Sequence, residues 1–267
     1  MFVSTPALAV YFKSGVQQRV SNEVSKAEVF TKLRNEYNQK CLLKSGSEIA
    51  NCYIGRKNQH EDPSVIIIGD SHSDASLTAV ISSLPKENNG VLFLGYQNCL
   101  PIQDVKAHSE TEGFACGEYN KKVFDFLKNN HTKTTVLIIN RTSAYIYGTK
   151  EGYPEINSKP LAWFNERPSY VSNEYLTEFG HKYRKTLCSF NNGERQVYTT
   201  YPMHGFSYDV PKKISRDLMQ NKQIKKLSID RSAYEKRNQF VKSQIDKASL
   251  DCGVKVLDIA KVFCDKD

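Results

Sequence analysis

The stretch that decides the fold is residues 64–73, SVIIIGDSHS. Its apolar run, residues 65–68, has the length and β-branched composition of a buried strand and stops abruptly at Gly-Asp-Ser-His. A helix-like pattern begins at Asp74. This order of strand, turn and helix predicts that the Ser71 hydroxyl lies at the carboxyl end of a strand, beside a helix N-terminus. In open α/β sheets the reactive groups lie at that edge.

Four more short strand-like runs follow, and helix-like segments separate the strands. The predicted strands are residues 65–68, 91–94, 136–140, 197–201 and 254–258. The predicted helices are residues 74–84, 118–130, 173–190 and 229–250. Strands that alternate with helices favour an α/β fold with a mainly parallel, five-stranded sheet.

The first part of the chain lacks this alternation. We therefore expect an N-terminal extension over residues 1–60 and an α/β domain over residues 61–267. Within the extension, residues 21–40 have the periodicity of one amphipathic helix. Residues 3–12 are apolar but too short to cross a bilayer, which fits either the end of a membrane segment or a packed strand or helix. Residues 148–168, rich in Pro, Gly and aromatic side chains, predict a long loop.

The chain is basic, with a net charge of +8 over 267 residues. Such a surface suits anionic polysaccharide, lipid headgroups or nucleic acid, although charge also serves solubility alone. The sequence contains no zinc-ligand pattern, no RNP-type aromatic motif and no compact basic arm. We therefore expect no nucleic-acid partner.

Seven cysteines favour an oxidising compartment. Two pairs enclose short loops next to the first two predicted strands and are disulfide candidates: Cys41 with Cys52, and Cys99 with Cys116. Zinc ligation is the rival interpretation, but no Cys-x-x-Cys occurs and the histidines are scattered, so we expect no metal site. The cysteines that remain are Cys188, Cys252 and Cys264, and the odd count leaves at least one unpaired.

Ser71 is the candidate nucleophile. A serine hydroxyl needs a base to take its proton and donors for the oxyanion that forms when it attacks an acyl carbon. The N–H groups at a helix N-terminus are such donors. The structural alternative is a tight turn in which Asp70 or Ser73 caps the helix.

With His72 directly after the serine, residues 68–73 resemble the first block of the SGNH (GDSL-like) hydrolases. In particular, they resemble the SGNH domain fused to bacterial acyltransferase-3 membrane proteins, which O-acetylate cell-surface polysaccharides. The Cys41/Cys52 pair, residues 98–101 (NCLP) and residues 256–258 (VLD) followed by Cys264 agree with this resemblance, which covers roughly residues 40–267. It implies a three-layer, flavodoxin-like α/β fold.

The resemblance also implies a function. An O-acetyltransferase domain of this kind moves an acyl group to a polysaccharide such as lipopolysaccharide through Ser71. Its partners are an acyltransferase-3 membrane domain and the carbohydrate acceptor, its place is the periplasmic face of the bacterial inner membrane, and it uses no cofactor.

The resemblance places further site residues. It implies oxyanion donors at Gly95 and Asn140, and a substrate-binding side chain at Arg141. Each has a structural alternative: a turn glycine, a polar residue that ends a strand, and a surface ion pair. The sequence departs from the family's Gly-x-Asn-Asp, because Asn140 is followed by Arg141.

The family's general base belongs to an Asp-x-x-His motif, which does not occur in this sequence. We expect that the chain is truncated at its C-terminus. The alternative within the chain is a substitute base at His204, which follows the fourth predicted strand. Whether the chain is itself an enzyme is therefore open. A carbohydrate or lipid esterase of SGNH type, or a non-catalytic domain that lacks the base, remain alternatives.

Overall fold

The computed structural model describes residues 20–50, 52–149, 159–224 and 226–263. The chain forms two compact units. The small unit consists of Met1–Arg34 and Phe206–Ile229, and the large unit of Asn35–Gly205 and Asp230–Asp267. The expected domain boundary at residue 60 stays a prediction, and the apolar residues 3–12 lie outside the described residues. None of the helices in the described ranges has both the length and the apolar character needed to cross a membrane.

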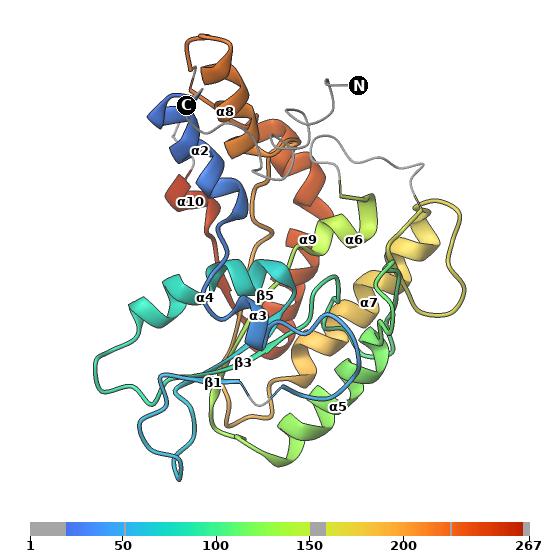
Figure 1. The fold of residues 1–267 in the computed structure, drawn as a ribbon. Helices are drawn as coiled ribbons and strands as arrows, with labels where there is room; N and C mark the ends of the chain where they lie inside the picture. The colour runs from blue at the N-terminus through green and yellow to red at the C-terminus, as the bar shows by residue number, and fades with distance from the viewer. Residues whose placement is uncertain (1–19, 51, 150–158, 225, 264–267) are drawn as a thin grey trace, which may run out of the picture. The chain divides into compact units, whose positions relative to one another are not determined.

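In the described part of the small unit, α2 (Asn22–Lys32) and α8 (Val210–Met219) pack against each other (Figure 1). Both start at a side-chain cap. The Ser21 hydroxyl accepts a hydrogen bond from the Val24 N–H, and the Asp209 carboxylate accepts one from the Lys212 N–H. α8 was not predicted from the sequence, although its apolar residues recur every four positions.

The single helix predicted over residues 21–40 is wrong. The chain instead forms α2 and a separate short helix, α3 (Asn38–Cys41). Between them, Asn35 Oδ1 accepts a hydrogen bond from the Tyr37 N–H at 2.8 Å, a local turn that competes with helix. Asn35 Nδ2 also donates to the Asp74 carbonyl at 2.7 Å, and this long-range contact overrides the helical periodicity.

The large unit contains a six-stranded sheet. Its strands are β1 (Tyr53–Ile54), β2 (Val65–Gly69), β3 (Val91–Gly95), β5 (Thr135–Ile139), β7 (Val197–Thr200) and β8 (Lys255–Leu257). Their spatial order is β1-β3-β2-β5-β7-β8, and only the edge strand β1 runs antiparallel to its neighbour. The mainly parallel sheet is confirmed. The count of five strands is wrong, because β1 is two residues long and has no periodicity that would reveal it.

Helices cover both faces of this sheet. Along β2, Ile66 and Ile68 belong to one hydrophobic cluster and Ile67 to another, as expected for side chains that alternate across a strand. The first cluster includes side chains from α5 (Cys116–Asn129), α7 (Asn173–Ser189) and α9 (Arg231–Cys252). The second includes side chains from α3 and from α4 (Ser71–Ser83). The three-layer α/β fold is therefore confirmed.

Shorter elements lie in the segments that connect the main helices and strands. They are α6 (Thr142–Tyr147), α10 (Ala260–Phe263) and a two-stranded ribbon of β4 (Lys106–Ala107) with β6 (Ala162–Trp163). The loop predicted over residues 148–168 thus contains β6, and its residues 150–158 lie outside the described residues.

Three disulfides lie among the described residues of the large unit. Cys41–Cys52 and Cys99–Cys116 confirm the two predicted pairs. The third, Cys188–Cys252, joins α7 to α9 across 64 positions of sequence and was left unassigned by the sequence. By the chain-entropy account, closing so long a loop destabilises the unfolded chain by about 4 kcal/mol. Cys264 lies outside the described residues.

Candidate active site

Ser71 is the first residue of α4 and directly follows the turn that ends β2. Its side chain is exposed. Among the described residues, neither the hydroxyl nor the backbone N–H of Ser71 has a hydrogen-bond partner. Both groups are therefore available to a ligand, and the N-terminal end of α4 favours negative charge there.

Gly69 makes this turn sterically possible. A Cβ atom at Gly69 would lie 1.9 Å from the carbonyl oxygen of Ile139 and 2.9 Å from Oδ1 of Asn140. No side chain fits at that position, so β2 and β5 approach closely just before the serine. The same geometry places the Asn140 amide directly beside the turn.

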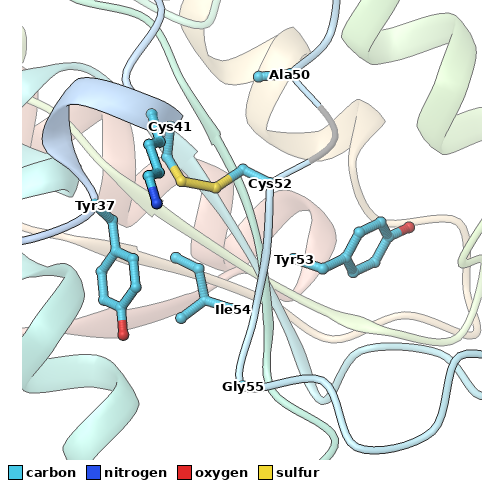
Figure 2. A pocket seen from close by; sticks show the side chains of 8 residues that line it. Tyr37, Cys41, Ala50, Cys52, Tyr53, Ile54 and Gly55 are labelled. Atoms are coloured by element: carbon cyan, nitrogen blue, oxygen red, sulfur yellow. A yellow bond between two sulfur atoms is a disulfide. The ribbon is translucent and has the colours of Figure 1, made fainter.

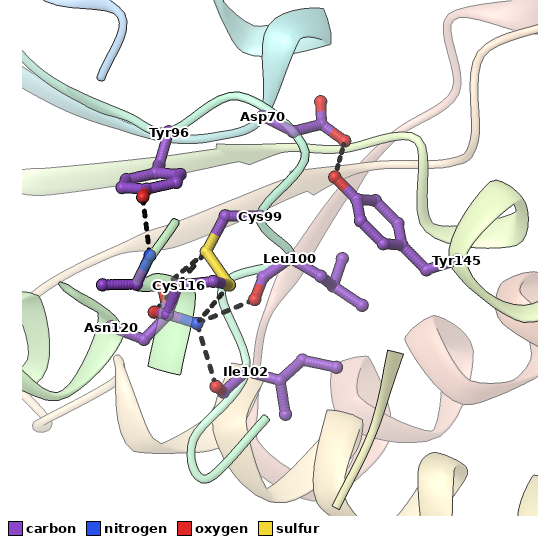
Figure 3. Close-up of a disulfide and its surroundings, with 9 residues drawn as sticks. Asp70, Tyr96, Cys99, Leu100, Ile102, Cys116, Asn120 and Tyr145 are labelled. Carbon is purple, nitrogen blue, oxygen red and sulfur yellow. Dashed lines mark hydrogen bonds between the residues drawn. A yellow bond between two sulfur atoms is a disulfide. The ribbon is translucent and has the colours of Figure 1, made fainter. Parts of the chain in front are cut away.

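The side chain of Asp70 holds the turn in position through hydrogen bonds. Its carboxylate is 2% exposed and is the N-cap of α4, with Oδ1 accepting a hydrogen bond from the His72 N–H at 2.8 Å. Oδ2 accepts from the Tyr145 hydroxyl (Figure 3) and from the Arg141 backbone N–H, both at 3.0 Å. One buried carboxylate thus ties the start of α4 to the start of α6.

Burial, together with the negative charge of Asp70, raises the pKa of Tyr145 well above its usual 10.0. Tyr145 therefore stays a neutral donor to Asp70 throughout the physiological range. Ser73, which is fully buried, adds a hydrogen bond from its hydroxyl to the Asp70 carbonyl at 2.6 Å. The capping interpretation of Asp70 is thus correct, and it leaves the Ser71 hydroxyl unused.

Gly95 ends β3 in direct register with Gly69 on β2. A Cβ atom at Gly95 would lie 2.2 Å from Cζ of Phe93, whose ring is fully buried beneath it. The Gly95 carbonyl accepts a hydrogen bond from the Leu43 N–H at 3.0 Å. Gly95 therefore lies beside the serine turn and has a packing reason to be glycine, and its role as an oxyanion donor stays a prediction.

The loop that follows Gly95 is fixed by the second disulfide. Cys99–Cys116 joins this loop to the start of α5, and Asn120 Nδ2 donates to the carbonyls of Leu100 and Ile102 at 2.8 and 3.1 Å (Figure 3). Covalent and hydrogen-bonded restraints thus hold the segment that borders the serine turn.

Asn140 and Arg141 follow β5. The Asn140 side chain is 5% exposed, and its Oδ1 has no hydrogen-bond partner among the described residues. Burying a polar group without a partner is costly, which makes this amide a candidate for contact with a ligand. Arg141 Nη2 donates to the Thr149 carbonyl at 2.8 Å, so this side chain reaches the segment after α6.

His204 follows β7 in the large unit. β5 lies between β2 and β7, which separates their axes by about 10 Å. Nδ1 of His204 is buried without a partner among the described residues, and the ring packs against Phe263 with centroids 5.4 Å apart. Among the described contacts, none joins His204 to Ser71, and its role as a base stays a prediction.

Two further features complete the large unit. A cavity of about 410 Å³ lies beside the Cys41–Cys52 disulfide, between Tyr37, Lys40 and β1 (Figure 2). It does not include Ser71, Gly95 or Asn140 in its lining. No three His, Cys, Asp or Glu side chains in the described ranges gather as metal ligands would.

Sequence reasoning missed Tyr145, which fixes Asp70. No motif marks this tyrosine, because its contact with Asp70 spans 75 positions of sequence. Asp70 itself was considered only as a cap.

Three comparisons relate the chain to known proteins. A family model described as "SGNH domain (fused to AT3 domains)" matches residues 37–267. The fold is similar to that of the periplasmic domain of a lipopolysaccharide acetyltransferase from Salmonella ser. Paratyphi A, with a TM-score of 0.57 and 13% sequence identity over 94% of this chain and 84% of that one. No curated protein sequence matches this chain.

Proposed function

Because the chain belongs to the family of SGNH domains fused to AT3 domains, we propose that it transfers an acyl group to a hydroxyl of a cell-surface polysaccharide through Ser71. The acyl group is acetyl, and the donor is delivered by an acyltransferase-3 membrane domain. The reaction takes place on the periplasmic face of the bacterial inner membrane. The lipopolysaccharide acetyltransferase of similar fold is consistent with this acceptor class.

One observation carries the proposal: the exposed hydroxyl and N–H of Ser71 stand unengaged at the N-terminus of α4, on a turn that Asp70 holds rigid. A nucleophile needs this combination of access and fixed position. Buried residues next to the turn hold it in position without using the Ser71 hydroxyl, which is therefore available to react.

The step runs through a covalent intermediate. Oγ of Ser71 bonds to the acyl carbon, a base takes its proton, and the donor's leaving group departs with a proton to give an acyl-serine. A hydroxyl of the acceptor then attacks the same carbon, and its proton passes through the base as Ser71 is released. Water in place of the sugar hydroxyl would give the esterase reaction.

The oxyanion of each step needs donors about 3 Å away. The N–H of Ser71 and Nδ2 of the Asn140 amide supply two of them in this proposal. The close approach of β2 to β5 at Gly69 supports this role, because it brings the Asn140 side chain next to the turn. Gly95, in register with Gly69, borders the same site.

The experiment that tests the proposal measures acetyl groups on the surface glycan of cells that produce the complete protein. Ser71→Ala is expected to abolish acetylation, whereas Ser83→Ala, at the exposed far end of α4, is expected to leave it unchanged. Full acetylation with Ser71→Ala would refute the nucleophile. An assay with and without glycan acceptor separates transfer from hydrolysis, and His204→Gln tests the candidate base in the same cells.

A further inference from the structure

The net positive charge of the protein comes almost entirely from the small unit. This unit spans about a fifth of the sequence, yet it holds 11 of the 37 Lys and Arg and only 4 of the 29 Asp and Glu, so that it carries +7 of the net +8. The large unit, with the candidate active site, is nearly neutral. Eight of the cations lie in described residues: Lys26, Lys32, Arg34, Lys212, Lys213, Arg216, Lys222 and Lys226.

The acids of α8 do not offset this excess. Asp209 pairs with Lys212 at 3.6 Å, and Asp217 pairs with Lys213 at 2.7 Å. Two of the six cations in residues 206–229 thus neutralise both acids of that segment. Arg216 and Lys222, which are both exposed, add net positive charge to the surface around α8.

Large apolar side chains are exposed on the same unit. Of the eleven large hydrophobic side chains that are exposed among the described residues, six belong to it: Val29, Phe30, Leu33, Tyr208, Met219 and Ile224. Val29 and Phe30 lie in the last turns of α2, Leu33 is the residue that caps its C-terminus, and each is about 60% exposed. Clustered exposure of this kind marks an interaction site rather than an ordinary soluble surface.

From these two observations we propose that the small unit binds the surface of an anionic lipid bilayer. Its Lys and Arg side chains attract the phosphate groups of the lipids, while the apolar side chains of α2 and α8 enter the boundary between headgroups and acyl chains. An anionic polysaccharide would pair with the Lys and Arg side chains, but it has little apolar surface to contact Phe30 and Leu33. A bilayer has both anionic headgroups and apolar chains.

The test measures how the protein cosediments with vesicles. Vesicles of equal parts phosphatidylglycerol and phosphatidylcholine are expected to bind it, and vesicles of phosphatidylcholine alone are expected to bind it far more weakly. Replacing Lys212, Arg216 and Lys222 by Gln is expected to weaken binding to the anionic vesicles by roughly 100-fold. High salt is expected to weaken it as well, because it screens the lipid charge.

Two more variants make the test specific. Phe30→Ser with Leu33→Ser is expected to weaken binding without changing the net charge. The matched control replaces three exposed lysines of the large unit, Lys128, Lys133 and Lys247, by Gln and is expected to bind as the unchanged protein does. Circular dichroism confirms that each variant is folded.

Three results would overturn the proposal: equal binding to charged and neutral vesicles, equal loss in the control variant, or undiminished binding after the Phe30 and Leu33 replacements. The last result, combined with binding to a soluble anionic polysaccharide, would show that the Lys and Arg side chains of the small unit bind a glycan and not a bilayer.

Discussion

The hydroxyl of Tyr145 donates a hydrogen bond of 3.0 Å to the buried carboxylate of Asp70, the residue that precedes the candidate nucleophile. Through this contact, α6 supports the first turn of α4. The relationship explains how an exposed serine is held in one position, because the groups that hold it are themselves buried and almost fully hydrogen-bonded.

Tyr145→Phe tests this support. The change removes one hydrogen bond to a buried charge, so we expect the free energy of unfolding to fall by about 2 kcal/mol. Urea unfolding followed by circular dichroism measures it. Tyr170→Phe, at a tyrosine that is 54% exposed, is the matched control and is expected to change stability little. Equal effects of the two changes would show that the hydrogen bond to Asp70 stabilises the fold no more than an exposed tyrosine hydroxyl does.

Gly69→Ala tests the close approach of β2 to β5. The added methyl group would lie 1.9 Å from a backbone oxygen, which cannot move without shifting the strand. We expect a loss of more than about 3 kcal/mol in the free energy of unfolding, or failure to fold. The control is Gly193→Ala, where φ is +88° and no atom lies within 4 Å of the new Cβ. That change is expected to lower the free energy of unfolding by only about 1 kcal/mol. A similar loss at both glycines would contradict the predicted steric clash at Gly69.

Asn140→Ala tests the proposed oxyanion donor. Removal of one donor from such a site lowers the rate of the chemical step by roughly 10²- to 10³-fold. Acetyl transfer by the complete protein is therefore expected to slow by that factor, while the variant still folds. Asn129→Ala, at an exposed position near the end of α5, is the control. A normal rate in the Asn140 variant would exclude this side chain from the reaction.

The raised pKa values of the buried tyrosines predict that the free energy of unfolding falls at alkaline pH. Burial raises the pKa of Tyr183 to about 12 and that of Tyr145 further above its usual 10.0. The unfolded chain loses these protons near pH 10 while the folded protein keeps them, so their contribution is full below about pH 10 and is lost as the pH rises toward the folded-state values.

We therefore expect the urea midpoint to fall between about pH 9 and pH 11, and to fall less steeply when Tyr145 and Tyr183 are both replaced by Phe. The two replacements lower stability at neutral pH as well, so the slope with pH is the quantity to compare. Identical slopes for the two proteins would contradict the assigned pKa directions.

Much of the fold was predictable because buried parallel strands leave a strong pattern. The five main strands lie within one residue of their predicted bounds, and the first three are short apolar runs between polar turns. The edge strand β1 was missed, because two residues leave no pattern. The break between α2 and α3 was missed because Asn35 is fixed by Asp74, 39 positions away.

The site was predictable in part, for the same physical reasons. Ser71 was assigned from the order of strand, turn and helix, whereas Gly95 and Asn140 were implied by the family resemblance, and their roles stay predictions. Gly95 ends β3 and Asn140 follows β5, and neighbouring parallel strands bring their carboxyl ends to one edge. The Asp70–Tyr145 contact and the Cys188–Cys252 disulfide depend on tertiary packing, and no local pattern announces either. His204 follows β7, which runs parallel to the strands of the site, but the described contacts do not link it to Ser71 and its role as a base stays a prediction.

Ser71 carries the acyl group in the proposed reaction, and mass spectrometry can detect that group on the serine itself. The complete protein is incubated with an acetyl donor such as p-nitrophenyl acetate, quenched in acid and digested. We expect one acetyl group on the Ser71 hydroxyl, present in the Ser83→Ala control and absent from Ser71→Ala. An unmodified Ser71 in a protein that still acetylates its glycan would contradict the claim.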